Sequence, residues 1–194
     1  METFVWDQRF VTGIEIVDAQ HHRLVNIINQ LGEVMLTGDN LSEGRMQIVF
    51  KQLSDYAREH FRDEEQLMRH AGLDPRHIDA HKHHHHEFVE QLAAMWRARG
   101  AMQNPAGTLH GFLSAWLAFH ILGEDQSMTR QIALVEAGES ASTAFEVESQ
   151  PEDNSTDALL KALRTLYHVL SQQNRDLAAA NDRLQHEIAA RQQE

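Results

Sequence analysis

A helical pattern that opens at Asp74 and Pro75 carries a cluster of histidines on one face. An N-cap aspartate followed by a proline at the first helical position is typical of a helix start. The residues of that face recur at helical spacing, namely His77, His81, His85, Phe88, Leu92 and Met95. Because the second half of this face is apolar, we expect the histidines to point into the core. Neutral imidazole is the commonest transition-metal ligand, so the cluster indicates a metal site.

Three further helical patterns each place metal-ligand side chains at positions that the apolar spacing assigns to the core. The first ends near Gly38, the second ends near Gly72, and the fourth follows a turn at residues 100–107. These side chains are His21 in the first pattern, His60 and Glu64 in the second, and His120 and Asp125 in the fourth. A buried glutamate without a partner is costly, so Glu64 needs a cation or a strong hydrogen-bond donor.

Four helices joined by short loops predict an all-α fold, an antiparallel up-down-up-down four-helix bundle with an N-terminal arm and a C-terminal helix or coiled coil. Metal sites in such bundles are built from side chains on facing helices. Residues 1–13 are expected to form the arm. We predict the bundle domain at 1–134, a polar linker too hydrophilic to fold alone at 135–156, and the C-terminal helix at 157–194.

The C-terminal segment carries leucines spaced by seven residues, at Leu163, Leu170, Leu177 and Leu184. This spacing is typical of a coiled-coil seam and suggests a homodimer through 157–194. Polar residues interrupt the seam, and an ordinary amphipathic helix docked on the bundle is the alternative.

The two ligands from the third helix are chosen by their depth in the bundle, because side chains that share an ion must lie at one level. The midpoint of His60 and Glu64 lies eight residues from the turn that joins the second and third helices. The midpoint of His81 and His85 lies at the same separation on the other side, whereas a pair of His77 and His81 would lie only four residues from it. This count favours His81 and His85, with His77 and His81 as the alternative.

Composition excludes several classes of site and partner. The chain has a formal net charge of -12, which argues against nucleic acid as a partner. It has no cysteine, so any metal must be held by nitrogen and oxygen atoms. The N-terminus lacks the features of a signal peptide, and the most apolar stretch, 112–122, is too short to span a bilayer. We therefore predict a soluble cytoplasmic protein without a membrane partner.

The other histidines of the third helical pattern, His83, His84 and His86, are expected to face the solvent.

The residues in these patterns resemble the hemerythrins, in particular the bacterial hemerythrin domains. The matching pieces lie in the family's order between about residues 4 and 130, and they are Trp6, 10–13, 17–21, 60–68, 81–88 and 116–125. The stretch between Glu64 and His81 is longer than the family pattern and contains the extra His77.

The resemblance implies a non-heme di-iron centre that binds O₂ reversibly, with two Fe ions and a bridging oxo or hydroxo group. By position, its seven ligands would be His21, His60, Glu64, His81, His85, His120 and Asp125. Glu64 and Asp125 would bridge the irons, one of which would take three histidines and the other two, leaving one position open.

The expected function is that of an oxygen or redox sensor domain, because a simple carrier needs neither a linker nor a coiled coil. The C-terminal segment resembles helices that join sensors to cyclase or kinase output domains, so we expect an output domain downstream. The chain itself is expected not to be an enzyme. An O₂ store or carrier without signalling is the alternative. A di-iron peroxidase or ferroxidase fits less well, since such sites are richer in carboxylates.

Overall fold

The computed structural model describes residues 4–37, 42–150 and scattered positions between Leu163 and Arg191. Its α-helices are α1 (Glu15–Thr37), α2 (Glu43–His70), α3 (Pro75–Ala98), α4 (Pro105–Phe119), α5 (Gln126–Glu136) and α6 (Ala141–Glu148). Short 3-10 turns lie at Gln8–Phe10 and Arg99–Ala101, and a π-helical segment lies at His120–Asp125. The expected all-α fold is confirmed.

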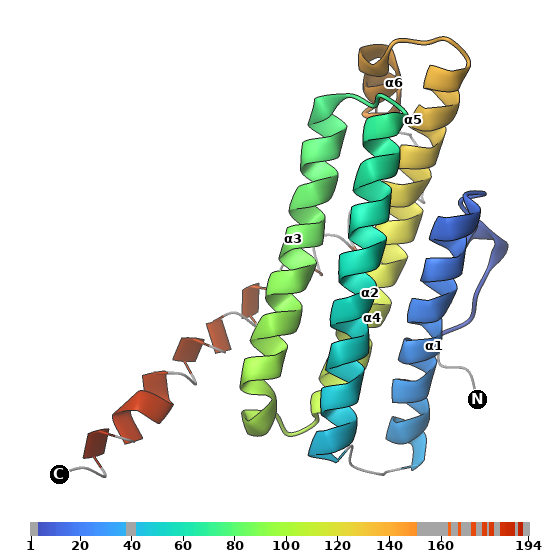
Figure 1. Ribbon diagram of the computed structural model, residues 1–194. Coiled ribbons are helices and arrows are strands. Elements are labelled where there is room, and N and C mark those ends of the chain that lie inside the picture. Colours follow the sequence, from blue (N-terminus) through green and yellow to red (C-terminus); the bar gives the residue numbers. More distant parts are fainter. Residues whose placement is uncertain are drawn as a thin grey trace.

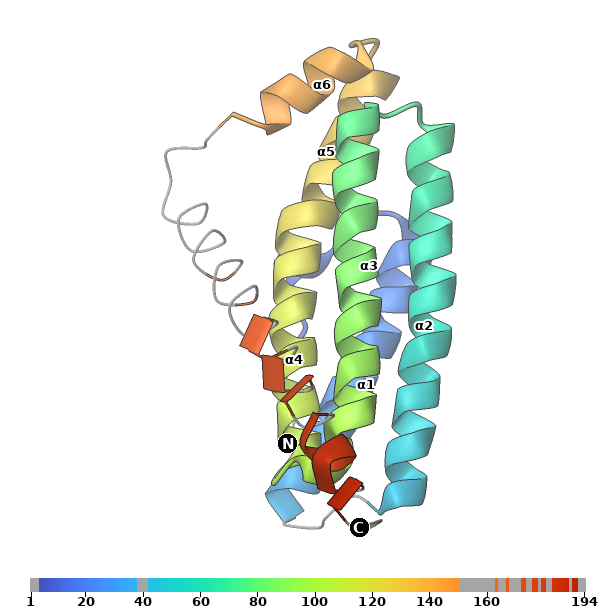
Figure 2. The same cartoon turned by 90° about the vertical axis from the view of Figure 1, so that its left-hand side faces the viewer.

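The four long rods of the structure are α1, α2, α3 and the continuous run of α4, the π-helical segment and α5. Successive rods run in opposite directions, α1 packs beside α2 and α4, and α2 packs beside α3 (Figures 1 and 2). The N-terminal arm lies along the bundle, where the Phe4 amide donates to Asn29 Oδ1 at 2.8 Å and Gln126 Nε2 donates to the Val11 carbonyl at 2.9 Å. The up-down-up-down bundle and its arm therefore form as expected.

The helix starts follow from local chemistry in the sequence. The Asp74 side chain accepts from the Arg76 amide at the start of α3, and the Asn104 side chain accepts from the Gly107 amide at the start of α4. Each of these helices opens with a proline, which has no amide proton to leave unpaired. Gly72, with φ of 69°, makes the turn between α2 and α3 in a conformation that favours glycine.

The bundle core is apolar between the ligand residues and the end of the bundle where α2 starts and α3 ends. Leu53, Phe88, Leu113 and Trp116 are fully buried there. A smaller apolar cluster around Met68 and Met128 closes the opposite end. Among the described helices, none combines the length and the apolar character that crossing a membrane requires.

The stretch predicted as a linker contains secondary structure. Residues 141–148 form α6, which folds over the end of α5 (Figure 2). Its Ala144 is buried, the Arg76 guanidinium lies 4.3 Å from the Phe145 ring centre, and Arg130 pairs with Glu148 at 2.7 Å. Arginines of the bundle thus hold a helix whose own apolar surface is small, a tertiary effect that its composition does not reveal.

The C-terminal segment is described only at scattered positions, and all of these are helical. Tyr167 is buried against the bundle, whereas Leu177 and Leu184 are 68% and 58% exposed. Leu170 lies outside the described residues. The coiled coil and the division of the chain into three parts stay predictions.

We expect the substitution Leu113→Ala to lower the free energy of unfolding by about 2–5 kcal/mol, because it leaves a cavity in the packed core. The matched control is Ile48→Ala on α2, where the isoleucine is 59% exposed and the change should stay within about 0.5 kcal/mol. Denaturant unfolding of both variants measures the difference. Equal losses would contradict this packing of α4.

Candidate metal centre

Seven potential ligand side chains from all four rods of the bundle meet in its interior. They are His21 on α1, His60 and Glu64 on α2, His81 and His85 on α3, and His120 and Asp125 in the π-helical segment. Each is at most 3% exposed. They form two groups with ligand atoms within 4.8 Å of one another, one of Glu64, His81, His85 and His120 and one of His21, His60, Glu64 and Asp125.

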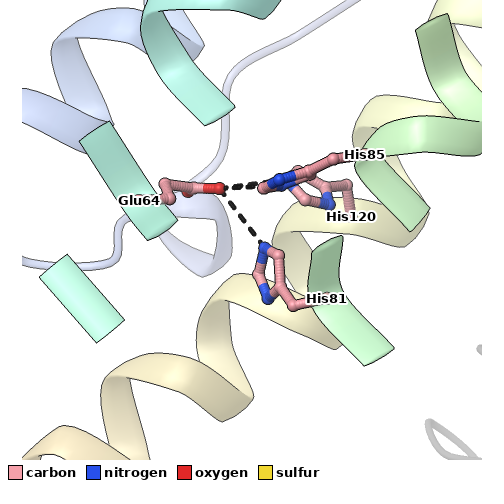
Figure 3. A group of neighbouring side chains, drawn as sticks. All are labelled: Glu64, His81, His85 and His120. Atoms are coloured by element: carbon pink, nitrogen blue, oxygen red, sulfur yellow. Dashed lines mark hydrogen bonds and ion pairs between the residues drawn. The ribbon is translucent and has the colours of Figure 1, made fainter. Parts of the chain in front are cut away.

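Glu64 directs its two carboxylate oxygens to different groups. Its Oε2 lies 3.3 Å from His81 Nε2, 3.2 Å from His85 Nε2 and 3.4 Å from His120 Nε2 (Figure 3). Its Oε1 lies 3.5 Å from His60 Nε2. Two ligands about 2.1 Å from one ion and about 90° apart are separated by about 3.0 Å, so these spacings suit a shared cation.

Asp125 repeats this division. Its Oδ2 lies 3.0 Å from His21 Nε2, and its Oδ1 lies 3.3 Å from His120 Nε2 and 3.6 Å from His81 Nε2. Both carboxylates therefore face both groups of histidines. This is the arrangement by which two carboxylates bridge two cations.

The π-helical segment explains how His120 and Asp125 face the same way. In a regular α-helix, residues five apart point about 140° away from each other. A π-helical turn is wider, with hydrogen bonds between residues i and i+5, and such turns are frequent at functional sites. The five-residue spacing in the sequence is the one signal of this segment, because i and i+4 would be the expected spacing on an α-helix.

Gln20 and Asp63 form a hydrogen-bonded pair next to His60, on the side of its ring that faces away from Glu64. His60 Nδ1 lies 2.9 Å from Gln20 Oε1, and Gln20 Nε2 donates to Asp63 Oδ2 at 2.8 Å. With its Nδ1 proton donated to the amide oxygen, His60 presents the Nε2 lone pair to the site. Sequence analysis did not assign Gln20 and Asp63 to the site, although both lie within the stretches that resemble the hemerythrins, 17–21 and 60–68.

Aromatic rings stack on three of the imidazoles. Phe61 lies parallel to His85 at 3.9 Å between ring centres, Trp116 lies over His120 at 4.2 Å, and Tyr56 lies over His60 at 5.0 Å. These rings fix the imidazole planes and surround the site with low-dielectric material. Electrostatic interactions inside it are correspondingly strong.

Burial and neighbouring charges set the protonation of the ligands. Burial favours neutral Glu64, but the surrounding histidines outweigh this effect and hold its pKa well below the usual range. Burial holds the pKa of His60 well below its usual value. Burial also acts to lower the pKa of His81, but the hydrogen bond to Glu64 and the negative charges of the nearby carboxylates together outweigh burial and raise that pKa to about 9. His81 must therefore lose a proton when a cation binds.

The residues fit a pair of cations because many of their atoms have no other partner. Among the described residues, the buried atoms without a hydrogen bond include the Nε2 atoms of His21, His60, His85 and His120, Oε1 of Glu64 and both carboxylate oxygens of Asp125. Leaving buried polar groups unpaired costs about 1–3 kcal/mol each, and more when they are charged. Two cations would satisfy these atoms together.

His77 lies beside the site but belongs to neither group. Gln131 Nε2 donates to His77 Nδ1 at 2.9 Å, which ties this histidine to α5. The structure thus brings His81 and His85, and not His77, to Glu64. That His81 and His85 are the ligating pair stays a prediction.

His84 departs from the expectation that it faces the solvent. It is 5% exposed, and its Nδ1 lies 3.2 Å from Glu124 Oε2, whereas the side chains of His83 and His86 are 67% and 69% exposed as predicted. The correction has a structural reason, since the π-helical segment packs against this side of α3 and brings Glu124 to it.

The fold and the site together define a class of protein, a four-helix bundle with a candidate two-cation centre of histidines and carboxylates. The hemerythrin HHE cation binding domain family matches residues 12–132. The chain belongs to this hemerythrin family.

Curated relatives cover most of the same region. A bacteriohemerythrin of Stenotrophomonas maltophilia is 31% identical over 132 residues, which are 68% of this chain and 83% of the relative. A bacteriohemerythrin of Pseudomonas aeruginosa is 33% identical over 64% of this chain and 78% of its own length. A myohemerythrin of Theromyzon tessulatum is 28% identical over 64% and 89%. No solved structure matches the chain significantly.

We expect His81→Ala and His85→Ala to lower the bound metal below two ions per chain, because each removes an inward-facing ligand. His77→Ala is the matched control on the same helix face and should keep both ions. Metal analysis of the three purified variants, with circular dichroism as a check of folding, measures this. Loss in His77→Ala with retention in His85→Ala would place the ligand pair one helical turn earlier.

Proposed function

We propose that this chain is a non-heme di-iron protein that binds O₂ reversibly and is a binding protein rather than an enzyme. The observation that carries the proposal is the division of each carboxylate, Glu64 and Asp125, between two groups of histidines. Membership of a family whose relatives are bacteriohemerythrins and a myohemerythrin supports it. Two Fe(II) ions joined by an oxo or hydroxo bridge would supply the two electrons that O₂ takes up on binding.

The count of ligands favours an O₂ site on one side of the centre. His81, His85 and His120 with one oxygen from each carboxylate give five ligands, and a bridging group makes six. His21 and His60 with the other two oxygens and the same bridge make only five. An ion that prefers six ligands would therefore keep one position open beside His21 and His60.

The residues around this position bury it and orient His60, which suits the binding of a small apolar ligand. Tyr56 covers the His60 ring, and both residues are completely buried. The Gln20 amide holds His60 in the tautomer that ligates through Nε2. Exclusion of water by the surrounding apolar core would slow irreversible oxidation of the centre.

We expect the purified chain to hold two irons and to show a visible absorption band that forms when O₂ is added to the reduced protein. Lowering the O₂ pressure should remove the band, because the binding is reversible. Iron analysis and an optical titration with O₂ test both points. A single zinc ion and no O₂-dependent band would end the proposal.

We further propose that the domain is an oxygen or redox sensor that acts through its C-terminal helix on an output domain, in a cytoplasmic protein. A series of ring contacts that runs from the C-terminal segment through α4 toward the centre supports this role. The buried Tyr167 ring lies 5.9 Å from Phe112 and 6.0 Å from Phe119. Phe119 in turn contacts His84 edge to face at 5.6 Å and directly precedes His120.

The exposed apolar side chains further along the C-terminal segment suit a homodimer. Leu177, Leu184 and Ile188 are each more than half exposed, and the two leucines are seven residues apart. A second copy of the same helix would cover them, as in a coiled coil. A change of packing at Phe119 would then reach the dimer through Tyr167.

A sensor role predicts that hydrogen exchange in peptides covering residues 163–191 differs between the reduced and the oxygenated protein. Tyr167→Ala should abolish that difference, because it removes the contact with α4. His186→Ala, at an exposed position of the same segment, is the control and should preserve it. An O₂ store would show equal exchange in both states of the unaltered protein.

A further inference from the structure

A groove of about 760 Å³ runs between the outward-facing sides of α2 and α3. Its floor is apolar and is built from Phe50, Ala57, Phe61, Leu92, Ala93 and Trp96. Sites for small organic molecules commonly have volumes of about 300–1,000 Å³ and mostly apolar walls. The groove is separate from the interior cluster of metal ligands, although it shares a wall with it.

Cationic side chains outnumber acidic ones along the lining of the groove, in a chain whose net charge is -12. Four cationic side chains line the groove, namely Lys51, Arg58, Arg62 and Arg69, against one acidic side chain, Glu65. Each of these cations has an acidic neighbour, since Lys51 and Arg58 pair with Asp55, Arg62 with Asp63 and Arg69 with Glu65. The side chains of Lys51 and Arg58 are 74% and 75% exposed. Exposed ion pairs contribute little, so these two cations are free to exchange Asp55 for the anion of a ligand.

Two residues of the groove also touch the metal centre. Phe61 stacks on the His85 ring at 3.9 Å between ring centres. Glu65 Oε1 lies 3.5 Å from His85 Nδ1, the ring nitrogen on the far side from Glu64. A molecule in the groove would therefore lie against the two side chains that orient one metal ligand.

We propose that this groove binds a carboxylate with an alkyl chain, a fatty-acid-like monoanion, and that binding alters the surroundings of His85. The alkyl chain lies on the apolar floor from Trp96 and Ala93 to Phe61, and the carboxylate lies against Lys51 and Arg58. Charge complementarity favours this occupant, because its carboxylate can pair with Lys51 and Arg58, whereas a neutral apolar molecule cannot. The binding stands independently of the proposed function, whereas its effect on O₂ binding rests on that function.

Calorimetric titration of the full chain with decanoate, in whatever metal state it is isolated, tests the binding. We expect saturable binding of one decanoate per chain. Ala93→Trp should abolish it by filling the groove, and Ala80→Trp, at an exposed site on the same helix outside the groove, should not. Replacing Lys51 and Arg58 together by Gln should weaken binding about tenfold or more. The matched control replaces Arg45 and Arg97, which do not line the groove.

Several outcomes overturn the proposal. These are no saturable binding, equal affinity in Ala93→Trp, and equal affinity for decanol. A dimer that dissociates in Ala93→Trp would show that a second copy fills the groove instead. In the iron-loaded protein, decanoate should shift the O₂-dependent absorption band or the rate of its decay, and binding without either change would refute the link to His85. Absence of the band itself would count against the proposed function, and the calorimetric titration would still test whether the groove binds decanoate.

Discussion

The structure depends on the burial of two carboxylates among five imidazoles with few other partners. Glu64 and Asp125 are fully buried, and no lysine or arginine approaches either of them among the described ion pairs. Charges removed from water in this way require a strong compensating interaction. Two shared cations would provide it at the atoms that otherwise lack hydrogen bonds, and this need explains why all four rods contribute to one level of the bundle.

The backbone conformation also helps to bring these side chains together. The π-helical segment turns Asp125 toward the ligands of α1, and without it the long rod would present His120 alone. The same segment carries Glu124 to His84, and Phe119, the last residue of α4, lies beside Tyr167. One local change of helix geometry therefore brings His120 and Asp125 to the same group of side chains.

Much of this arrangement follows from sequence patterns because both the bundle and the centre repeat at helical spacing. The apolar ladders fix which face of each helix is buried, and Pro75 fixes the depth at which His81 and His85 lie. The features that sequence patterns missed depend on tertiary contacts. Helix α6 is held by Arg76 and Arg130 from distant parts of the chain, and His84 is buried by a partner in the π-helical segment. The groove between α2 and α3 likewise results from how two helices pack, which their separate patterns do not specify.

The account rests on two irons that share Glu64 and Asp125. X-ray absorption spectroscopy of the iron-loaded protein tests this most directly, because scattering between two metal ions reports their separation. The account predicts an iron-to-iron distance no greater than about 4 Å and an average first shell of nitrogen and oxygen ligands that includes imidazole. A spectrum with imidazole scattering but no second iron within that distance would contradict it.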